Sequence, residues 1–270
     1  MADLQKPSTN TTVYVFDVDG VLCDVGEPIN TDVLRHIAKL LDAAVYVAIN
    51  TGRGYDRVGV EVVEPLQEFL TDQSRMSHLF VATEMGGVTT HFVHGKAVHA
   101  ATAYCIPEEF KQKAVAVYER TGAAATMSNY AYKKAMSTFV KLAEVSQVDF
   151  DRQKAELVAE LQHVFAGEDI TIATTVESVD VHARNAGKHA GAHLIKQWVQ
   201  SVSDIAHDSF MCFGDSTGDY EMARYFAEQG AKTQFVFTGE ALAVDEHDGV
   251  AVTYTAEHYT AGTLEYLRKL

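Results

Sequence analysis

The stretch that decides the fold is VYVFDVDGVL, residues 13–22, in which an apolar and aromatic run leads directly into two aspartates and a glycine. The apolar run predicts a buried β-strand over Val13–Asp17. Asp17 and Asp19 are two positions apart, so at the period of a strand their carboxylates are expected on the same side. Carboxylates held that close repel each other, and we therefore expect a positive group between them.

The residues around this stretch repeat one pattern of buried strands and amphipathic helices. Before residue 87 the sequence predicts helices at Thr31–Leu41 and within Val58–Leu70, and strands at Ala44–Ile49 and Leu79–Ala82. After residue 184 it predicts helices at Gly187–Val199, Tyr220–Glu228 and Tyr259–Leu270, and strands at Ser209–Phe213, Gln234–Phe237 and Val250–Tyr254. Such alternation is typical of an α/β fold with a parallel sheet covered by helices on both faces.

The region between these two parts has a different pattern. Its expected strands alternate apolar and polar residues, at Thr89–Val93, Met136–Glu144, Ile170–Ala173 and Val176–Val181, and its expected helices are Glu108–Arg120 and Phe150–Phe165. Alternation favours an antiparallel sheet covered on one face only. We therefore predict a core at residues 1–86 and 185–270 and an inserted α+β domain at residues 87–184.

The composition limits the classes of partner. The chain has 270 residues and a formal net charge of −15, from 37 acidic and 22 basic side chains. This balance argues against nucleic acid and anionic membranes, but a small anionic substrate needs only a few local cations. Three dispersed cysteines without metal-ligand spacing favour a reducing, cytoplasmic setting. Residues 1–12 are polar, so we expect a short disordered lead and neither a signal peptide nor a membrane span.

Polar side chains gather where the predicted strands end. Ligands of open parallel sheets bind at the carboxyl ends of the strands. The residues that stand at these ends are Asp17, Asp19, Thr51, Gly52, Asp215 and Asp219. Hard carboxylate oxygens in this number suit Mg²⁺, and Lys188, at the start of a predicted helix, adds a second positive charge. A carboxylate nucleophile, a metal, a lysine and a hydroxyl donor are the parts of a phosphoryl-transfer site.

Together these motifs resemble those of the haloacid dehalogenase (HAD) superfamily of phosphatases. The matching segments occur in the family's order: DVDGVL at 17–22, Thr51 within NTGR, Lys188, and GDSTGD at 214–219. The resemblance implies a Rossmann-like parallel-sheet core, and the insert resembles, in position and pattern, the type 2 cap of the Cof-like, sucrose-phosphatase and trehalose-phosphatase branches. Gly218 departs from the pattern, because many Cof-like members have Asn there.

The resemblance also implies roles for the core residues. Asp17 is expected to attack phosphorus and form an aspartyl phosphate, and Asp19 to protonate the leaving alcohol and then activate water. Thr51 and the backbone N–H of Gly52 are expected to bind phosphoryl oxygens. Lys188 is expected to screen the charge between the phosphate and the nucleophile. The implied Mg²⁺ ligands are Asp17, the backbone carbonyl of Asp19, Asp215 and, directly or through water, Asp219.

The insert is expected to close over the site and read the leaving group. The candidate substrate contacts are Arg53 in the core and Lys133, Lys134 and Arg184 in the insert. Each of these, taken alone, also reads as a surface ion pair or as a solvated loop residue.

The sequence thus predicts a Mg²⁺-dependent phosphoric monoester hydrolase that acts on a small phosphorylated metabolite, a sugar phosphate by preference. A phosphomutase of the phosphomannomutase type is the alternative within enzymes, since it shares the scaffold but retains the phosphoryl group. A receiver-like or inactive phosphoryl-binding module is the alternative outside enzymes. A receiver places its acceptor aspartate after a different strand and has no inserted cap.

Overall fold

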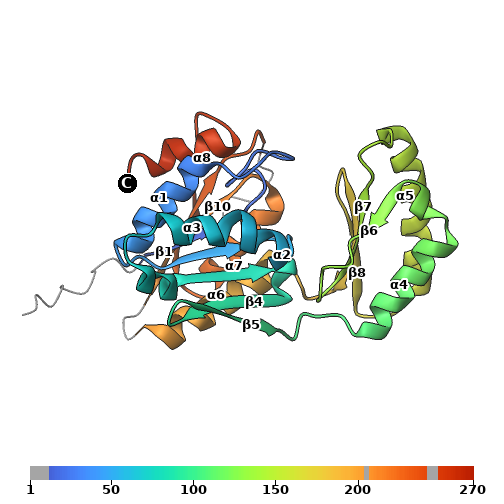
Figure 1. The fold of residues 1–270 in the computed structure, drawn as a ribbon, viewed down its shortest axis with the longest axis horizontal. Helices are drawn as coiled ribbons and strands as arrows, with labels where there is room; N and C mark the ends of the chain where they lie inside the picture. Colours follow the sequence, from blue (N-terminus) through green and yellow to red (C-terminus); the bar gives the residue numbers. More distant parts are fainter. Residues whose placement is uncertain (1–11, 204–206, 242–248) are drawn as a thin grey trace, which may run out of the picture. The chain divides into compact units, whose positions relative to one another are not determined.

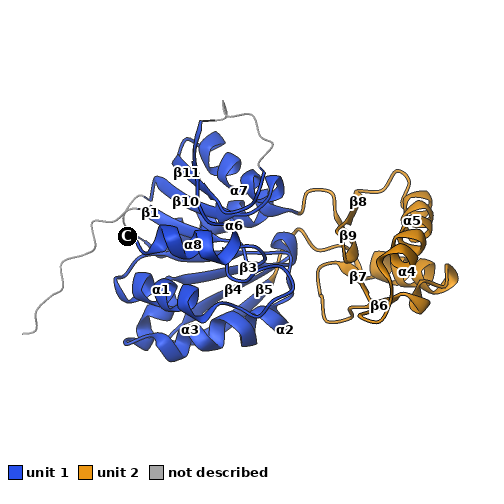
Figure 2. Ribbon diagram, turned by 90° about the horizontal axis from the view of Figure 1, so that it is seen from above, with its two compact units in different colours: residues 1–100, 187–270 blue, residues 101–186 orange. Residues whose placement is uncertain are grey.

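The computed structural model describes residues 12–203, 207–241 and 249–270. The expected disordered lead lies, except for its last residue, outside the described residues. The chain divides into two compact units, which we call unit 1 (residues 1–100 and 187–270) and unit 2 (residues 101–186), coloured separately in Figure 2. Each is described by itself below.

Unit 1 is built on an eight-stranded sheet with the strand order β12-β11-β10-β1-β2-β3-β4-β5 (Figure 1). Its strands are β1 (Thr12–Phe16), β2 (Val47–Asn50), β3 (Leu79–Thr83), β4 (Val88–Val93), β5 (Lys96–Ala101), β10 (Ser209–Gly214), β11 (Lys232–Phe237) and β12 (Val250–Tyr254). All neighbouring pairs from β12 to β3 are parallel, and β4 pairs antiparallel with β3.

Helices cover both faces of this sheet. They are α1 (Thr31–Asp42), α2 (Tyr55–Val58), α3 (Glu64–Phe69), α6 (Lys188–Val202), α7 (Thr217–Glu228) and α8 (Tyr259–Leu267). Strand β1 shows why two layers of helices are needed, because Tyr14 and Phe16 pack into one apolar cluster with α1, α3 and α8, whereas Val13 and Val15 pack into a second one with α6 and α7. The sequence prediction of a parallel sheet buried on both faces is confirmed.

Residues 87–100 belong to unit 1, although the sequence analysis assigned them to the insert. Strand β4 continues the core sheet beside β3, and β5 forms its edge with all six residues exposed. Alternation of apolar and polar residues does not distinguish an antiparallel edge of a parallel sheet from a strand in a separate sheet. The unit boundaries therefore fall at residues 100/101 and 186/187 rather than at 86/87 and 184/185.

The helix expected within Val58–Leu70 is interrupted. Between α2 and α3 the backbone forms one π-helical segment, Gly59–Val63. Pro65, at the start of α3, lacks the backbone N–H that a continuous α-helix would use. Single π-helical turns inside α-helices are frequent at functional sites.

Unit 2 is a two-layer α+β fold. Its antiparallel sheet has the order β6-β7-β9-β8, from β6 (Met127–Asn129), β7 (Ser137–Lys141), β8 (Ile170–Thr174) and β9 (Ser178–Ala183), and its helices are α4 (Glu108–Arg120) and α5 (Gln147–Val164). The two helices pack with one sheet face around a core that includes Tyr118 and Phe139, whose rings stack at 4.7 Å. The strand expected at Met136–Glu144 is shorter, because the chain turns at residues 142–145 before α5.

No helix in the described parts of the chain combines the length and the apolar composition that crossing a membrane requires.

Candidate active site

The site lies in unit 1, where three adjacent parallel strands end. β1 lies between β2 and β10, and Phe16 is in register with both Ile49 and Phe213. Asp17, which follows β1, donates its backbone N–H to the carbonyl of Phe213 at 3.1 Å. The parallel register therefore brings the segments after β1, β2 and β10 to the same edge of the sheet.

Lys188, the first residue of α6, is the centre of this arrangement. Its Nζ atom lies 2.5 Å from Oδ1 of Asp17 and 2.7 Å from Oδ1 of Asp219, and it donates to the backbone carbonyl of Asn50 at 2.8 Å. The lysine side chain is only 11% exposed. Burial disfavours its charge, but the two carboxylates outweigh that effect and hold the pKa of Lys188 above its usual range.

Three carboxylates form a cluster around this lysine. Oxygens of Asp17, Asp215 and Asp219 all lie within 4.8 Å of one another. Burial, reinforced by the charge of Asp219, raises the pKa of Asp17 well above its usual value and that of Asp215 to about 7. If all three were ionised, the cluster would carry more negative charge than one lysine offsets, which is why protons are held more tightly there. Its hard oxygen donors fit a divalent cation such as Mg²⁺, which would supply the missing positive charge.

Asp219 is fixed by the start of α7. Its Oδ2 accepts from the hydroxyl of Ser216 at 2.6 Å and from the backbone N–H groups of Ser216 and Asp215 at 3.2 and 3.3 Å. Ser216 in turn caps the backbone N–H of Asp219, which completes a capping box. Despite its burial, the pKa of Asp219 is lowered by Lys188 and by Ser216. Its second oxygen is thus left to hold Lys188.

The turn after β1 brings the backbone close to this cluster. Gly20 has φ +72°, a conformation that strains other residues, and a Cβ atom there would overlap the side chain of Asp215. Glycine at this position therefore allows the turn and the carboxylate to pack together.

Asp19 has a different partner from Asp17. Its Oδ1 and Oδ2 accept from Nη2 and Nε of Arg53 at 2.6 and 3.0 Å, while Nη1 of Arg53 lies 2.6 Å from Oε2 of Glu61. The arginine side chain is 10% exposed, whereas that of Asp19 is 44% exposed. Glu61 comes from the π-helical segment. Arg53 is therefore the centre of a second ion-pair network. From the sequence, Arg53 was expected only as a substrate contact or as part of a surface ion pair.

The expectation that Asp17 and Asp19 share one side does not match this geometry. β1 ends at Phe16, so the period of a strand no longer applies, and Asp19 lies in the turn that follows. Each carboxylate has a cation of its own, Lys188 for Asp17 and Arg53 for Asp19. The sequence argument for a positive partner thus holds for both residues, but not for one partner between them.

Thr51 and Gly52 lie at the end of β2. Thr51 is 1% exposed, and its hydroxyl oxygen accepts from the backbone N–H of Arg53 at 3.2 Å. Met85 has φ 58°, a strained backbone conformation for this residue type. The backbone N–H of Met85 donates to the carbonyl of Thr51, and the carbonyl of Met85 accepts from the N–H of Gly187, the residue before Lys188. These two hydrogen bonds tie the end of β2 to the start of α6.

Asn50 is a site residue that the sequence analysis missed. It is fully buried, its carbonyl accepts from Lys188 Nζ, and its Nδ2 donates to the carbonyl of Lys188 at 2.8 Å. A Cβ atom at Gly191, one turn along α6, would overlap the Asn50 amide. The only signal in the sequence was a polar residue directly after the predicted buried strand Ala44–Ile49.

The candidate residues of the insert do not form one group. Lys133 Nζ lies 3.7 Å from Oδ1 of Asp180, and its side chain is 9% exposed. The carbonyl of Lys134 accepts from Lys111. Arg184 pairs at 3.3 Å with Asp169 on the surface. All of these contacts lie within unit 2.

Comparison with known proteins identifies the fold. No protein-family model and no curated protein sequence matches this chain. Solved structures do match: the C-terminal domain of Candida albicans trehalose-6-phosphate phosphatase (TM-score 0.66, 14% identity, covering 95% of this chain and 91% of that one) and a haloacid dehalogenase-like hydrolase from Bacteroides thetaiotaomicron (0.66, 10%, 96% and 98%). The chain has the haloacid dehalogenase-like fold.

Another structure with the HAD-like fold that matches is Plasmodium falciparum IMP-nucleotidase, with a TM-score of 0.55 and 13% identity. That match covers 76% of this chain but only 59% of the nucleotidase, so the chain spans little more than half of that enzyme's length. At these identities the likeness shows the fold, and the chemistry has to be argued from the site itself.

Proposed function

We propose that this protein is a Mg²⁺-dependent phosphatase that hydrolyses a small phosphorylated metabolite, a sugar phosphate by preference, through an aspartyl-phosphate intermediate. The observation that carries the proposal is the position of Lys188, which joins Asp17 and Asp219 within a cluster of three carboxylates. A carboxylate nucleophile can approach a phosphate only where positive charge offsets the repulsion between the two anions.

In the first step, an oxygen of Asp17 attacks phosphorus and the bond between phosphorus and the ester oxygen breaks. The proton of the Asp19 carboxyl passes to that oxygen, so the alcohol leaves neutral and Asp17 carries the phosphoryl group. Thr51 and the backbone N–H of Gly52 bind phosphoryl oxygens, and Lys188 neutralises charge beside the nucleophile. Mg²⁺, held by Asp17, Asp215 and the backbone carbonyl of Asp19 and supported by Asp219, would supply further neutralisation.

In the second step, water attacks the phosphorus of the aspartyl phosphate. The Asp19 carboxylate accepts a proton from this water, the bond between phosphorus and the Asp17 oxygen breaks, and inorganic phosphate leaves. Both carboxyl groups then return to their starting states. General acid–base catalysis of this kind contributes about 10²–10⁴-fold.

The ion pair of Asp19 sets a condition on these steps. Arg53 donates to both carboxylate oxygens, so both oxygens face the guanidinium rather than a substrate. At least one of the two hydrogen bonds must therefore open when substrate binds. Glu61 keeps the third side of the guanidinium in place, so Arg53 remains anchored when that bond opens. Arg53 and Glu61 are accordingly positioning residues for Asp19 in this proposal.

The substrate class rests on the names of the matching structures and on the chemistry of the site. The trehalose-6-phosphate phosphatase and the IMP-nucleotidase carry names that denote phosphate monoester substrates. The acidic composition of this chain fits a small substrate better than nucleic acid. The cysteines at 23, 105 and 212 form no disulfide with one another, and we propose a cytoplasmic setting.

A screen of phosphorylated metabolites with Mg²⁺, read as released inorganic phosphate, tests the proposal. We expect several sugar phosphates to be hydrolysed, with no release by the Asp17→Asn variant or after EDTA treatment. Hydrolysis that survives either change would contradict the proposal. Transfer of phosphate between two hydroxyl groups without net release would instead identify a phosphomutase.

A further inference from the structure

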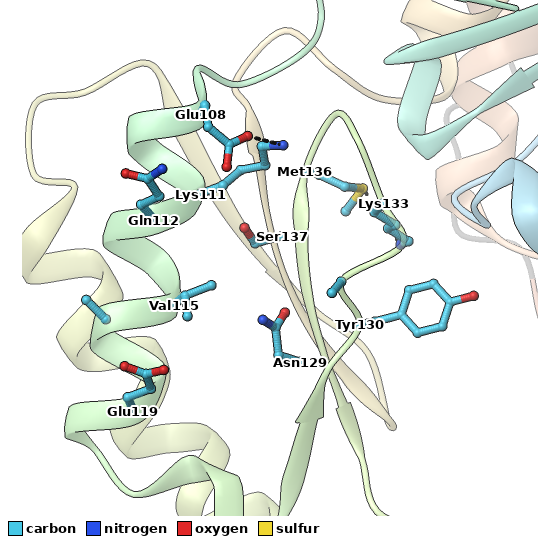
Figure 3. A pocket seen from close by; sticks show the side chains of 12 residues that line it. Glu108, Lys111, Gln112, Val115, Glu119, Asn129, Tyr130, Lys133, Met136 and Ser137 are labelled. Carbon is cyan, nitrogen blue, oxygen red and sulfur yellow. Dashed lines mark hydrogen bonds and ion pairs between the residues drawn. The ribbon is translucent and has the colours of Figure 1, made fainter.

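Unit 2 contains a cavity of about 320 Å³ between helix α4 and the strands β6 and β7 (Figure 3). Small-molecule pockets span about 300–1,000 Å³, so this volume suits a ligand the size of one sugar ring. All its lining residues belong to unit 2, whereas the carboxylate cluster lies in unit 1. The cavity thus shares no residue with the carboxylate cluster of the proposed catalytic site.

The strands present polar side chains to the cavity where their neighbours form the core. Met127 and Phe139 point toward the helices, and Asn129 and Ser137, two residues from each, share their side of the sheet. Figure 3 shows Asn129 and Ser137 facing α4 across the cavity. On this face of the sheet, the apolar side chains of the unit 2 core thus give way to the polar side chains of Asn129 on β6 and Ser137 on β7.

Helix α4 forms the opposite wall. Lys111, Val115 and Glu119 are four residues apart and lie on one face of the helix, with Gln112 and Ala116 beside them. Lys111 Nζ contacts Oε2 of Glu108 at 2.5 Å and the carbonyl of Lys134 at 3.0 Å, which leaves one of its three N–H groups.

Three uncharged polar side chains of the cavity have no partner among the residues that the structure describes: Ser137, Asn129 and Gln112. Ser137 is only 5% exposed as a whole residue, and its side chain lines the cavity. The amides of Asn129 and Gln112 each offer both donors and an acceptor. The cavity thus holds a set of hydrogen-bonding groups that a ligand can satisfy.

The charges around the cavity select against ions. Glu108 neutralises Lys111 at one end, and Glu119 stands at the other end of the α4 wall. The third cation of the lining, Lys133, lies 3.7 Å from Oδ1 of Asp180, so an anion gains no net attraction. Val115 and Met136 provide an apolar surface between the polar groups. Hydroxyl groups flanking an apolar ring face would complement this pattern.

We propose that this cavity is a binding site for a neutral polyhydroxylated ring, such as a free hexose or a cyclitol. Ser137, Asn129 and Gln112 bind its hydroxyl groups, the remaining N–H of Lys111 donates to one more, and Val115 and Met136 pack against its C–H face. The site binds unphosphorylated sugar independently of the carboxylate cluster, and it does not depend on the proposed phosphatase activity.

The test is a titration of the full-length protein, in EDTA, with glucose, mannose, trehalose and myo-inositol to millimolar concentrations. Binding is followed by calorimetry and by the amide NMR shifts of α4 and β7. We expect at least one of the four to bind, and Ser137→Ala and Gln112→Leu each to weaken it roughly three- to tenfold, the loss of one hydrogen bond. Gln162→Leu, the same change on the exposed surface of α5, should have no effect.

Two further comparisons can overturn the proposal. Asp17→Asn should leave sugar binding unchanged, and binding that is lost in Asp17→Asn but kept in Ser137→Ala would move the ligand to the carboxylate site. Gluconate and glucosamine, the charged analogues, should bind more weakly than glucose, so tighter binding of either would refute the neutral class. Absence of binding by all four uncharged compounds would refute the site.

Discussion

The two aspartates of one short motif belong to two different electrostatic regions. Around Asp17, the cation is a buried lysine from a helix 171 residues further along the chain. Of the two acidic neighbours, Asp219 is buried and Asp215 is half-buried. Around Asp19, which is 44% exposed, the cation is Arg53. Arg53 also forms an ion pair with Glu61, which lies in the π-helical segment. The first region is fixed by the fold, whereas the second can open at the surface, which suits a group that exchanges protons.

The largest expected effect is the removal of the nucleophile. Asp17→Asn should lower Mg²⁺-dependent phosphate release by at least about a thousand-fold, since no other carboxylate takes its place. The circular dichroism spectrum should stay unchanged. A variant with wild-type turnover would mean that Asp17 is not the nucleophile.

Loss of the buried cation should affect stability as well as activity. Lys188→Met leaves Asp17 and Asp219 as close, buried carboxylates, and we expect a loss of about 3–5 kcal/mol in the free energy of unfolding by urea. The second change Asp219→Asn should restore part of this loss. Lys196→Met, in the same helix, is the control, because Lys196 is half-buried and donates to the backbone carbonyl of Gln229, so its loss leaves no pair of buried carboxylates. An equal loss there would refute the assigned role.

In the exposed region the expected effect depends on the leaving group. Asp19→Ala should slow hydrolysis of a sugar phosphate by about 10²–10⁴-fold. Hydrolysis of 2,4-dinitrophenyl phosphate should fall much less, because its leaving group needs no proton. Equal losses with both substrates in single-turnover assays would remove the general-acid role from Asp19.

The pKa of Asp215, raised to about 7 by burial and by Asp219, predicts a pH dependence. The folded, metal-free protein holds this proton up to about pH 7, whereas the unfolded chain loses it near the ordinary value. The folded state therefore binds more protons between these values, and this group's contribution to stability falls as the pH rises through that window. Unfolding of wild type and Asp215→Asn in EDTA, compared at pH 5 and about pH 8, isolates the contribution; no difference in slope would contradict it.

The smallest expected effect tests the π-helical segment. Glu61→Gln removes the charge that anchors Arg53 and should lower kcat for a sugar phosphate roughly three- to tenfold, with KM nearly unchanged. Dinitrophenyl phosphate should again be less affected. Glu64→Gln, the matched change in the next turn, should have no effect, and a similar loss in both variants would indicate a general change in the helix.

The sequence predicted the parts of the site whose position follows from strand order. Asp17, Thr51 and Asp215 follow adjacent parallel strands, and the run of buried strands was enough to bring them together. The ion-pair partners of these residues were harder to predict from the sequence. The pairing of Asp19 with Arg53 depends on where β1 ends and on a π-helical segment, and the periodicity of apolar residues reveals neither. Asn50 was missed because its role needs the close approach of Gly191. The boundary of unit 2 was misplaced because an edge hairpin and a separate sheet alternate in the same way.

The insertion also bears on how unit 1 folds. Strand β1 lies beside β10, and Thr12 is in register with Ser209, so the centre of the sheet joins residues that are almost 200 positions apart. Unit 2 lies between them in the chain and has a core of its own. Pairings this distant in sequence form slowly, because a long loop must close first. We therefore expect unit 2 to acquire its structure early during synthesis, and the carboxylate cluster to assemble only when the last third of the chain arrives.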